Sequence, residues 1–80
     1  MARTLEVRQR NETPQQKRIL AALLGAPHGL TDFELSQRTE IYLSSINSAR
    51  NALLKQGRVR SSGRLRPSGR GGHATVWILA

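Results

Sequence analysis

Apolar residues follow a helical period in the first third of the chain. They recur at positions 19, 20, 23 and 24, which lie on one stripe of an α-helix. Before this stripe, Thr13 suits an N-cap, Pro14 the first helical position and Gln16 a capping box. Gly25, a favourable residue just after a helix, and a proline two residues later stop the pattern. A helix is therefore predicted from Pro14 to Leu24.

A second helix start follows after a short connector. Thr31 suits the N-cap and Glu34 completes another capping box, which predicts a short helix over Asp32 to Arg38. The next segment, residues 39–43, contains no glycine. We expect it to form a tight turn that is held in place by an inward-pointing Ile41.

A third helix is predicted to begin between Tyr42 and Ser44 and to end near Gln56, where Gly57 stops it. The apolar residues at positions 46, 49, 53 and 54 share one face of this helix. The remaining positions carry Ser, Asn, Arg and Lys, with no acidic and no bulky apolar side chain. The outer face is therefore small, polar and rich in hydrogen-bonding groups.

After Gly57 the pattern changes to that of strands. Arg58 to Arg64 and His73 to Leu79 are predicted strands, and Leu65 to Gly72 has the Gly, Pro and Ser content of a hairpin tip. Trp77 is expected in the core, packing the hairpin on the first helix. The predicted fold class is α+β, with three helices and a C-terminal two-stranded hairpin. This domain spans residues 13–80, after a flexible N-terminal arm over residues 1–12.

The charge is concentrated in one half of the sequence. The chain has 80 residues, 13 Lys and Arg against 5 Asp and Glu, and a net charge of +8. Residues 1–40 contain six of the bases and all five acids, whereas residues 41–80 contain seven bases and no acid. A surface charged only for solubility normally mixes both signs. The bias therefore favours a face that binds a polyanion.

The order helix, helix, turn, helix, glycine and basic hairpin resembles a winged helix-turn-helix domain over about residues 13–79. The residues that carry this resemblance are Ile46, Leu53, Leu54, Gly57 and Val59. The stretch from Thr31 to Trp77 is also similar to small winged-helix proteins of actinobacterial phages. The matching residues are Thr31, Asp32, Glu34, Leu35, Arg50, Leu53, Gly57, Val59, Ser62, Gly63, Ser68, Gly69, Arg70, Ala74, Val76 and Trp77. The chain resembles MarR-like domains without their dimerisation helices, which implies a monomer or a weak dimer.

The resemblance implies that the third helix enters the major groove of DNA, while the hairpin acts as a wing on the backbone or in the minor groove. The residue types agree, because asparagine pairs with adenine and arginine grips guanine or phosphate. The candidate DNA-contacting residues are Tyr42, Ser44, Ser45, Asn47, Ser48, Arg50, Asn51, Lys55, Arg60, Arg64, Arg66, Arg70 and His73. For Arg50 the alternative is an ion pair with Glu34 or Glu40, and for Trp77 it is base stacking.

The expected function is sequence-preferring binding of double-stranded DNA, by a small transcriptional regulator or a phage accessory factor. One alternative is RNA or single-strand binding, since Arg70, Gly71 and Gly72 resemble one unit of an Arg-Gly-Gly tail. A second alternative is a protein-interaction module within a nucleoprotein complex. An exposed apolar patch around Leu43, Leu65 and Leu79 would favour that alternative.

Catalytic and metal-binding patterns are missing from the sequence. With no cysteine and two distant histidines there is no thiolate nucleophile, disulfide or zinc spacing. The glycine-rich segment from Gly63 to Gly72 lacks the Gly-Lys-Ser/Thr ending of a P-loop. We therefore expect no enzyme, cofactor or metal. The longest apolar run, Ile19 to Leu24, is too short to cross a membrane. The expected location is the cytoplasm, or the host cytoplasm if a phage encodes the protein.

Overall fold

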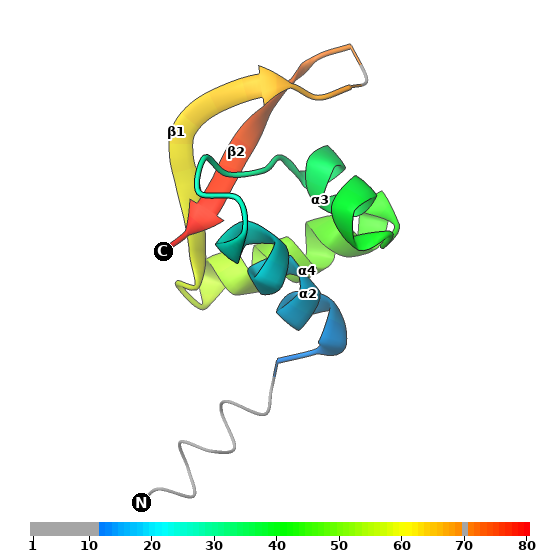
Figure 1. The fold of residues 1–80 in the computed structure, drawn as a ribbon, viewed down its shortest axis with the longest axis vertical. Coiled ribbons are helices and arrows are strands. Elements are labelled where there is room, and N and C mark those ends of the chain that lie inside the picture. The colour runs from blue at the N-terminus through cyan, green and yellow to red at the C-terminus, as the bar shows by residue number, and fades with distance from the viewer. Residues whose placement is uncertain (1–11, 70) are drawn as a thin grey trace, which may run out of the picture.

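A computed structural model describes residues 12–69 and 71–80. Its elements are α2 (Pro14–Leu24), α3 (Asp32–Thr39), α4 (Leu43–Lys55), β1 (Val59–Pro67) and β2 (His73–Leu79). Three helices are thus followed by a two-stranded antiparallel hairpin, an α+β layout consistent with a winged helix (Figure 1). The predicted N-terminal arm lies outside the described residues, apart from Glu12.

Both predicted capping boxes are present. The Thr13 hydroxyl accepts a hydrogen bond from the Gln16 backbone at 3.1 Å, and the Gln16 side chain accepts one from the Thr13 backbone. Thr31 and Glu34 make the same exchange at the start of α3. These reciprocal bonds satisfy backbone donors that the first helical turn leaves without partners. They explain why the starts of α2 and α3 are where the sequence predicts them.

The turn between α3 and α4 is held by side chains. α3 runs one residue further than predicted, to Thr39, and Glu40 then adopts a left-handed conformation with a φ of 60°. The Thr39 hydroxyl donates to the Leu35 carbonyl at 2.7 Å, and the Ser36 hydroxyl donates to the Ile41 carbonyl at 2.5 Å. Ile41 is buried, which confirms its predicted inward orientation.

A glycine follows the C-terminal end of both α2 and α4, and the two glycines differ in backbone conformation. Gly25 ends α2 at the predicted position with a φ of −87°, so this position does not require glycine. Gly57, after α4, has a φ of 74°. The next backbone N–H, of Arg58, donates to the Leu53 carbonyl at 2.9 Å, which closes the last turn and directs the chain into β1.

The core lies where the three helices meet the base of the hairpin. Ile19, Leu35, Ile46 and Leu53 are fully buried, and Val59 is 1% exposed. These residues come from all three helices and from the first residue of β1. Their spacing on α2 and α4 follows the apolar stripes of the sequence, because only one face of each helix is covered.

The hairpin contains an irregularity that the sequence did not predict. β1 pairs with β2 from Val59 opposite Leu79 to Pro67 opposite His73, but the register shifts between Ser61 and Leu65. Residues 62–64 on β1 therefore stand against Val76 alone on β2. Such a bulge bends its strand, and β1 is visibly curved in Figure 1. β1 also extends to Pro67, so residues 65–67 belong to the strand and not to the tip as predicted.

A short bridge joins the α2–α3 connector to the hairpin. The Leu30 N–H donates to the Trp77 carbonyl at 3.0 Å, and the Trp77 N–H donates to the Leu30 carbonyl at 2.8 Å. Gly29 makes this approach possible. It has a φ of 87°, and a Cβ there would stand 2.6 Å from the Trp77 carbonyl oxygen. β2 is thus hydrogen-bonded on both of its edges.

Candidate nucleic-acid interface

The outward side of α4 carries a group of polar side chains, which we call the polar face of α4. Its members are Ser44, Ser45, Asn47, Ser48, Asn51 and Lys55. All are exposed except the half-buried Ser45, and none is acidic. The opposite side is apolar, with Ile46 and Leu53 fully buried. The amphipathic pattern of α4 therefore places the predicted hydrogen-bonding residues in solvent.

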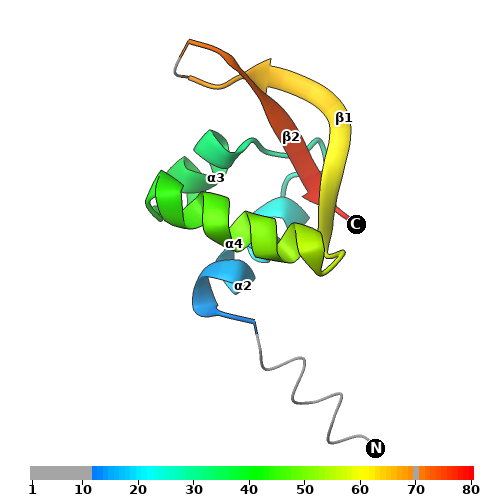
Figure 2. The same cartoon turned by 180° about the vertical axis from the view of Figure 1, so that it is seen from behind.

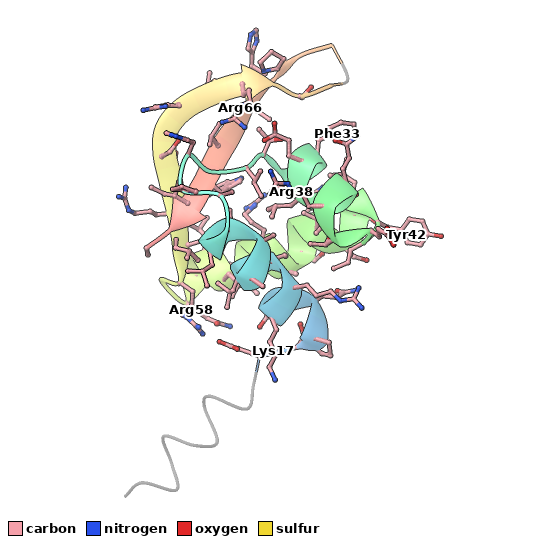
Figure 3. All side chains as sticks on the ribbon, in the orientation of Figure 1. Lys17, Phe33, Arg38, Tyr42, Arg58 and Arg66 are labelled. Atoms are coloured by element: carbon pink, nitrogen blue, oxygen red, sulfur yellow. The ribbon has the colours of Figure 1, made fainter. Side chains whose placement is uncertain are left out.

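Tyr42 precedes this face and is 84% exposed. It is the N-cap residue of α4, but its side chain makes no capping hydrogen bond. In Figure 3 its ring points away from the body of the molecule. The exposed ring is therefore available to a ligand.

Arg50 lies on α4 but does not belong to the polar face. Its Nε and Nη2 donate to the two Asp32 carboxylate oxygens at 2.9 and 2.7 Å. Its guanidinium also lies over the Trp77 ring, 4.2 Å from the centroid. Its side chain is only 15% exposed. The ion pair considered from the sequence exists, but the partner is Asp32 and not Glu34 or Glu40.

Trp77 is half-buried on β2 and lies outside the main apolar cluster. The prediction that it would belong to the core on the first helix is therefore wrong in detail. Its backbone pairs with Leu30 and its ring carries the Arg50 guanidinium. A tryptophan face attracts a cation, and the contact strengthens where water is excluded. Trp77 thus joins the hairpin to α4 through Arg50.

The hairpin arginines fall into two groups. Arg60 and Arg64 on β1 are exposed and make no ion pair within the described residues. Arg66 is half-buried, and its Nη1 donates to the Glu34 carboxylate at 2.6 Å. Arg70 lies outside the described residues. Of the predicted wing contacts, Arg60 and Arg64 are thus available to a ligand, whereas Arg66 is paired.

The hairpin tip is attached to α3 by a second contact. A Cβ on Gly69 would come within 2.7 Å of the Phe33 ring, so the ring packs directly on the Gly69 backbone. Figure 3 shows Phe33 rising from α3 towards the tip. His73 is exposed at the start of β2, where it pairs with Pro67. The Phe33 and Arg66 contacts fix the hairpin over the N-terminal end of α3.

Glu34, in the first turn of α3, has a lowered pKa. Burial raises the pKa of this carboxyl, but hydrogen bonds from the Thr31 backbone and from Arg66, together with the Arg66 charge, outweigh burial and lower it overall. Glu34 therefore stays ionised at neutral pH and holds both the start of α3 and the hairpin.

Positive charge remains in excess after these pairs are formed. The described residues include four acids, of which Glu12, Asp32 and Glu34 are in ion pairs with Arg58, Arg50 and Arg66. Six described bases are in no ion pair with another described residue. They are Lys17, Arg18, Arg38, Lys55, Arg60 and Arg64. Three of them, Lys55, Arg60 and Arg64, lie in the segment that runs from the last residue of α4 into β1.

Three further features of the described part of the chain concern metal, membrane and pocket sites. No group of three His, Cys, Asp or Glu side chains there is placed to hold a metal ion. No helix of residues 12–69 and 71–80 has the length and apolar character to cross a bilayer. One open groove of about 330 Å³ is largely apolar, lined by Leu20, Ala21, Leu24, Arg58, Leu79 and Ala80.

The apolar patch expected around Leu43, Leu65 and Leu79 is only partly exposed. Leu65 is 67% exposed, whereas Leu43 and Leu79 are half-buried. The most exposed leucine in the described chain is Leu24, at 76%, on α2. The two most exposed leucines of the described residues therefore lie on different elements, Leu65 on the hairpin and Leu24 on α2.

Several residues hold this surface together through contacts that were not predicted from the sequence. Asp32 and Glu34 are recognisable as capping acids, but their arginine partners are 18 and 32 positions away. Phe33 carried only a general apolar signal. Nothing local indicates these long-range pairs, because they depend on how the hairpin folds over α3.

Comparison with models of protein families, with curated proteins and with solved structures found no match to this chain.

Proposed function

We propose that the protein binds double-stranded DNA through the polar face of α4, with the hairpin engaging the adjacent backbone. The observation that carries this proposal is the character of that face. It is solvent-exposed, free of acidic residues and composed of short hydrogen-bonding side chains, with Lys55 at its C-terminal end. An α-helix of this kind fits the major groove, where each base pair presents a distinct pattern of donors and acceptors.

The hairpin supplies the electrostatic part of the proposed contact. Lys55, Arg60 and Arg64 are free of ion pairs within the described residues and extend from the last residue of α4 along β1. Figure 2 shows α4 crossing one side of the molecule while the hairpin arches over the helices. Cations at these positions neutralise phosphates and release counterions, which drives binding that does not depend on sequence.

Arg50 and Arg66 have a different role in this proposal. Both were candidate DNA contacts, but Asp32 and Glu34 hold their guanidinium groups. They are positioning residues, because they fix α4 and the hairpin relative to α3. A surface whose parts are fixed before binding loses less conformational entropy when it binds.

The test is fluorescence anisotropy on a random-sequence DNA duplex, a single strand of the same length and a duplex RNA, each across a salt series. We expect the tightest binding to duplex DNA, with a slope of log K against log salt near about −4, which corresponds to roughly four phosphates. Equal weak binding to all three would contradict the proposal and leave only a generic polycation.

The other outcomes identify the two alternative functions. Preference for RNA or for the single strand would favour the RNA-binding alternative. Association with a protein that survives nuclease treatment would favour the interaction module. A role as a transcriptional regulator or a phage accessory factor is part of the proposal only if a preferred duplex sequence emerges.

A further inference from the structure

Asn47 and Asn51 differ from the rest of the polar face of α4. A carboxamide offers a donor and an acceptor side by side in one plane, whereas a serine hydroxyl offers a single rotating group. Both asparagines are exposed, and no hydrogen bond within the described chain engages either amide. They are four residues apart, so their side chains are neighbours on the same helical face.

The helix lacks a free arginine. Arg50 is the one arginine of α4, and its Nε and Nη2 both bond to Asp32 while its plane lies on Trp77. The guanidinium fork that reads the O6 and N7 of guanine is therefore occupied. With a side-chain exposure of 15%, Arg50 can reach a base only by leaving both partners.

From these two observations we propose that α4 reads adenine at two positions, through Asn47 and Asn51. The inference rests on the proposed DNA binding and adds a base preference to it. Each amide oxygen accepts from adenine N6, and each amide nitrogen donates to adenine N7. These paired groups exist only on the major-groove edge of an A·T pair.

The helix geometry sets the separation of the two adenines. Four residues advance about 6 Å along a helix axis, at about 1.5 Å per residue. Successive base pairs are about 3.4 Å apart. Because the major groove is inclined to the duplex axis, a helix that follows the groove advances less than about 6 Å along that axis, so the two asparagines meet base pairs that are one to two steps apart.

The remaining members of the face add little base preference. Ser44 and Ser48 have hydroxyls that accept or donate at any base. Lys55, the last residue of the helix, lies one turn beyond Asn51 and carries a compact charge on a flexible stem. We assign it to a phosphate, where position matters less than charge.

The first experiment is selection from a random duplex library by the wild type and by Asn47→Ala, Asn51→Ala and Gln15→Ala. We expect two preferred A·T pairs one to two steps apart in the wild-type consensus. Each Asn→Ala variant loses one of them, and Gln15→Ala, which removes an exposed carboxamide on α2 outside the polar face of α4, keeps both. Replacing either A·T pair by G·C lowers wild-type affinity about 5- to 100-fold.

An atomic substitution in the DNA sharpens the test. Replacing one preferred adenine with 7-deazaadenine removes the N7 acceptor, so it should weaken the wild type but not the variant that lacks the partner asparagine. A G·C consensus, a consensus unchanged by both asparagine variants, or tolerance of 7-deazaadenine would overturn the inference and leave DNA binding intact. Failure of the wild type to bind any duplex would overturn both proposals. Circular dichroism of each variant establishes that it is folded.

Discussion

Asp32 and Arg50 are joined by two parallel hydrogen bonds, of 2.9 and 2.7 Å, between a full carboxylate and the edge of a guanidinium. Asp32 is the first residue of α3 and Arg50 lies in the middle of α4. The guanidinium also lies 4.2 Å from the centroid of Trp77 on β2. This pair therefore connects α3 and α4 with the hairpin.

Arg50→Ala should lower the free energy of unfolding by about 1–3 kcal/mol, because it leaves the largely buried Asp32 carboxylate without its partner. Arg50→Lys should recover little of the loss, since an ammonium cannot form the same pair of parallel bonds. Urea unfolding of the three proteins measures this. An unchanged midpoint together with a lost preference for one duplex sequence would instead make Arg50 a base-reading residue.

Gly29→Ala should destabilise the protein by more than about 2 kcal/mol, because it adds a steric clash to an unfavourable φ. The new Cβ would stand 2.6 Å from both the Trp77 carbonyl oxygen and a Val76 methyl group. Gly63→Ala is the matched control, because Gly63 has a similar φ of 85° with nothing within 4 Å of the new Cβ. Its cost should stay near about 1–2 kcal/mol. Equal thermal stability of the two variants would contradict the close approach at Gly29.

The free energy of unfolding should fall in acid as the Glu34 carboxylate becomes protonated. Its pKa is lower in the folded protein than in the unfolded chain, so the unfolded chain binds more protons as the pH falls. The stabilisation is present in full above the ordinary glutamate pKa of about 4.3 and is lost as the pH falls through the lower folded-state pKa.

Unfolding of Glu34→Gln across this pH range checks the assignment. Its stability should depend less on pH than that of the wild type, because the amide keeps an oxygen for the capping box but cannot titrate. The exposed Glu40, which makes no ion pair within the described residues, provides the control. Glu40→Gln should retain the wild-type slope, and a similar flattening in both variants would remove the special role of Glu34.

Arg60→Ala and Arg64→Ala should each weaken binding to all duplexes and reduce the salt slope by about 0.9, the contribution of one phosphate contact. Lys17→Ala is the control, since Figure 3 places Lys17 at the end of the molecule opposite the hairpin tip. Anisotropy across a salt series measures the slopes. A change of salt slope in Lys17→Ala alone would show that the phosphate contacts lie on α2 and not on the hairpin.

The helix boundaries were predictable because their signals are local. Thr13 and Thr31 start helices through bonds that span three residues, and the apolar stripes of α2 and α4 select the buried faces. The exposed polar face of α4 was predictable for the same reason, since it is the remainder of an amphipathic helix.

The roles of Arg50, Arg66 and Trp77 were not predictable in this way. Arginines near a predicted wing look alike in sequence, and only the folded hairpin separates the paired Arg66 from the free Arg64. The bulge at residues 62–64 shifts the strand register and brings residues 65–67 into β1. No period in the sequence marks such an insertion, so the predicted tip was too long.

The most direct test of the central claim is an NMR titration of the ¹⁵N-labelled protein with a short DNA duplex at moderate salt. The account predicts that amide and side-chain shifts change along the polar face of α4, with the Asn47 and Asn51 carboxamides among the most affected, and along β1 at Arg60 and Arg64. Signals of Leu20 and Leu24 on α2 should stay in place. Changes confined to α2 and the end of β2, with α4 unaffected, would contradict it.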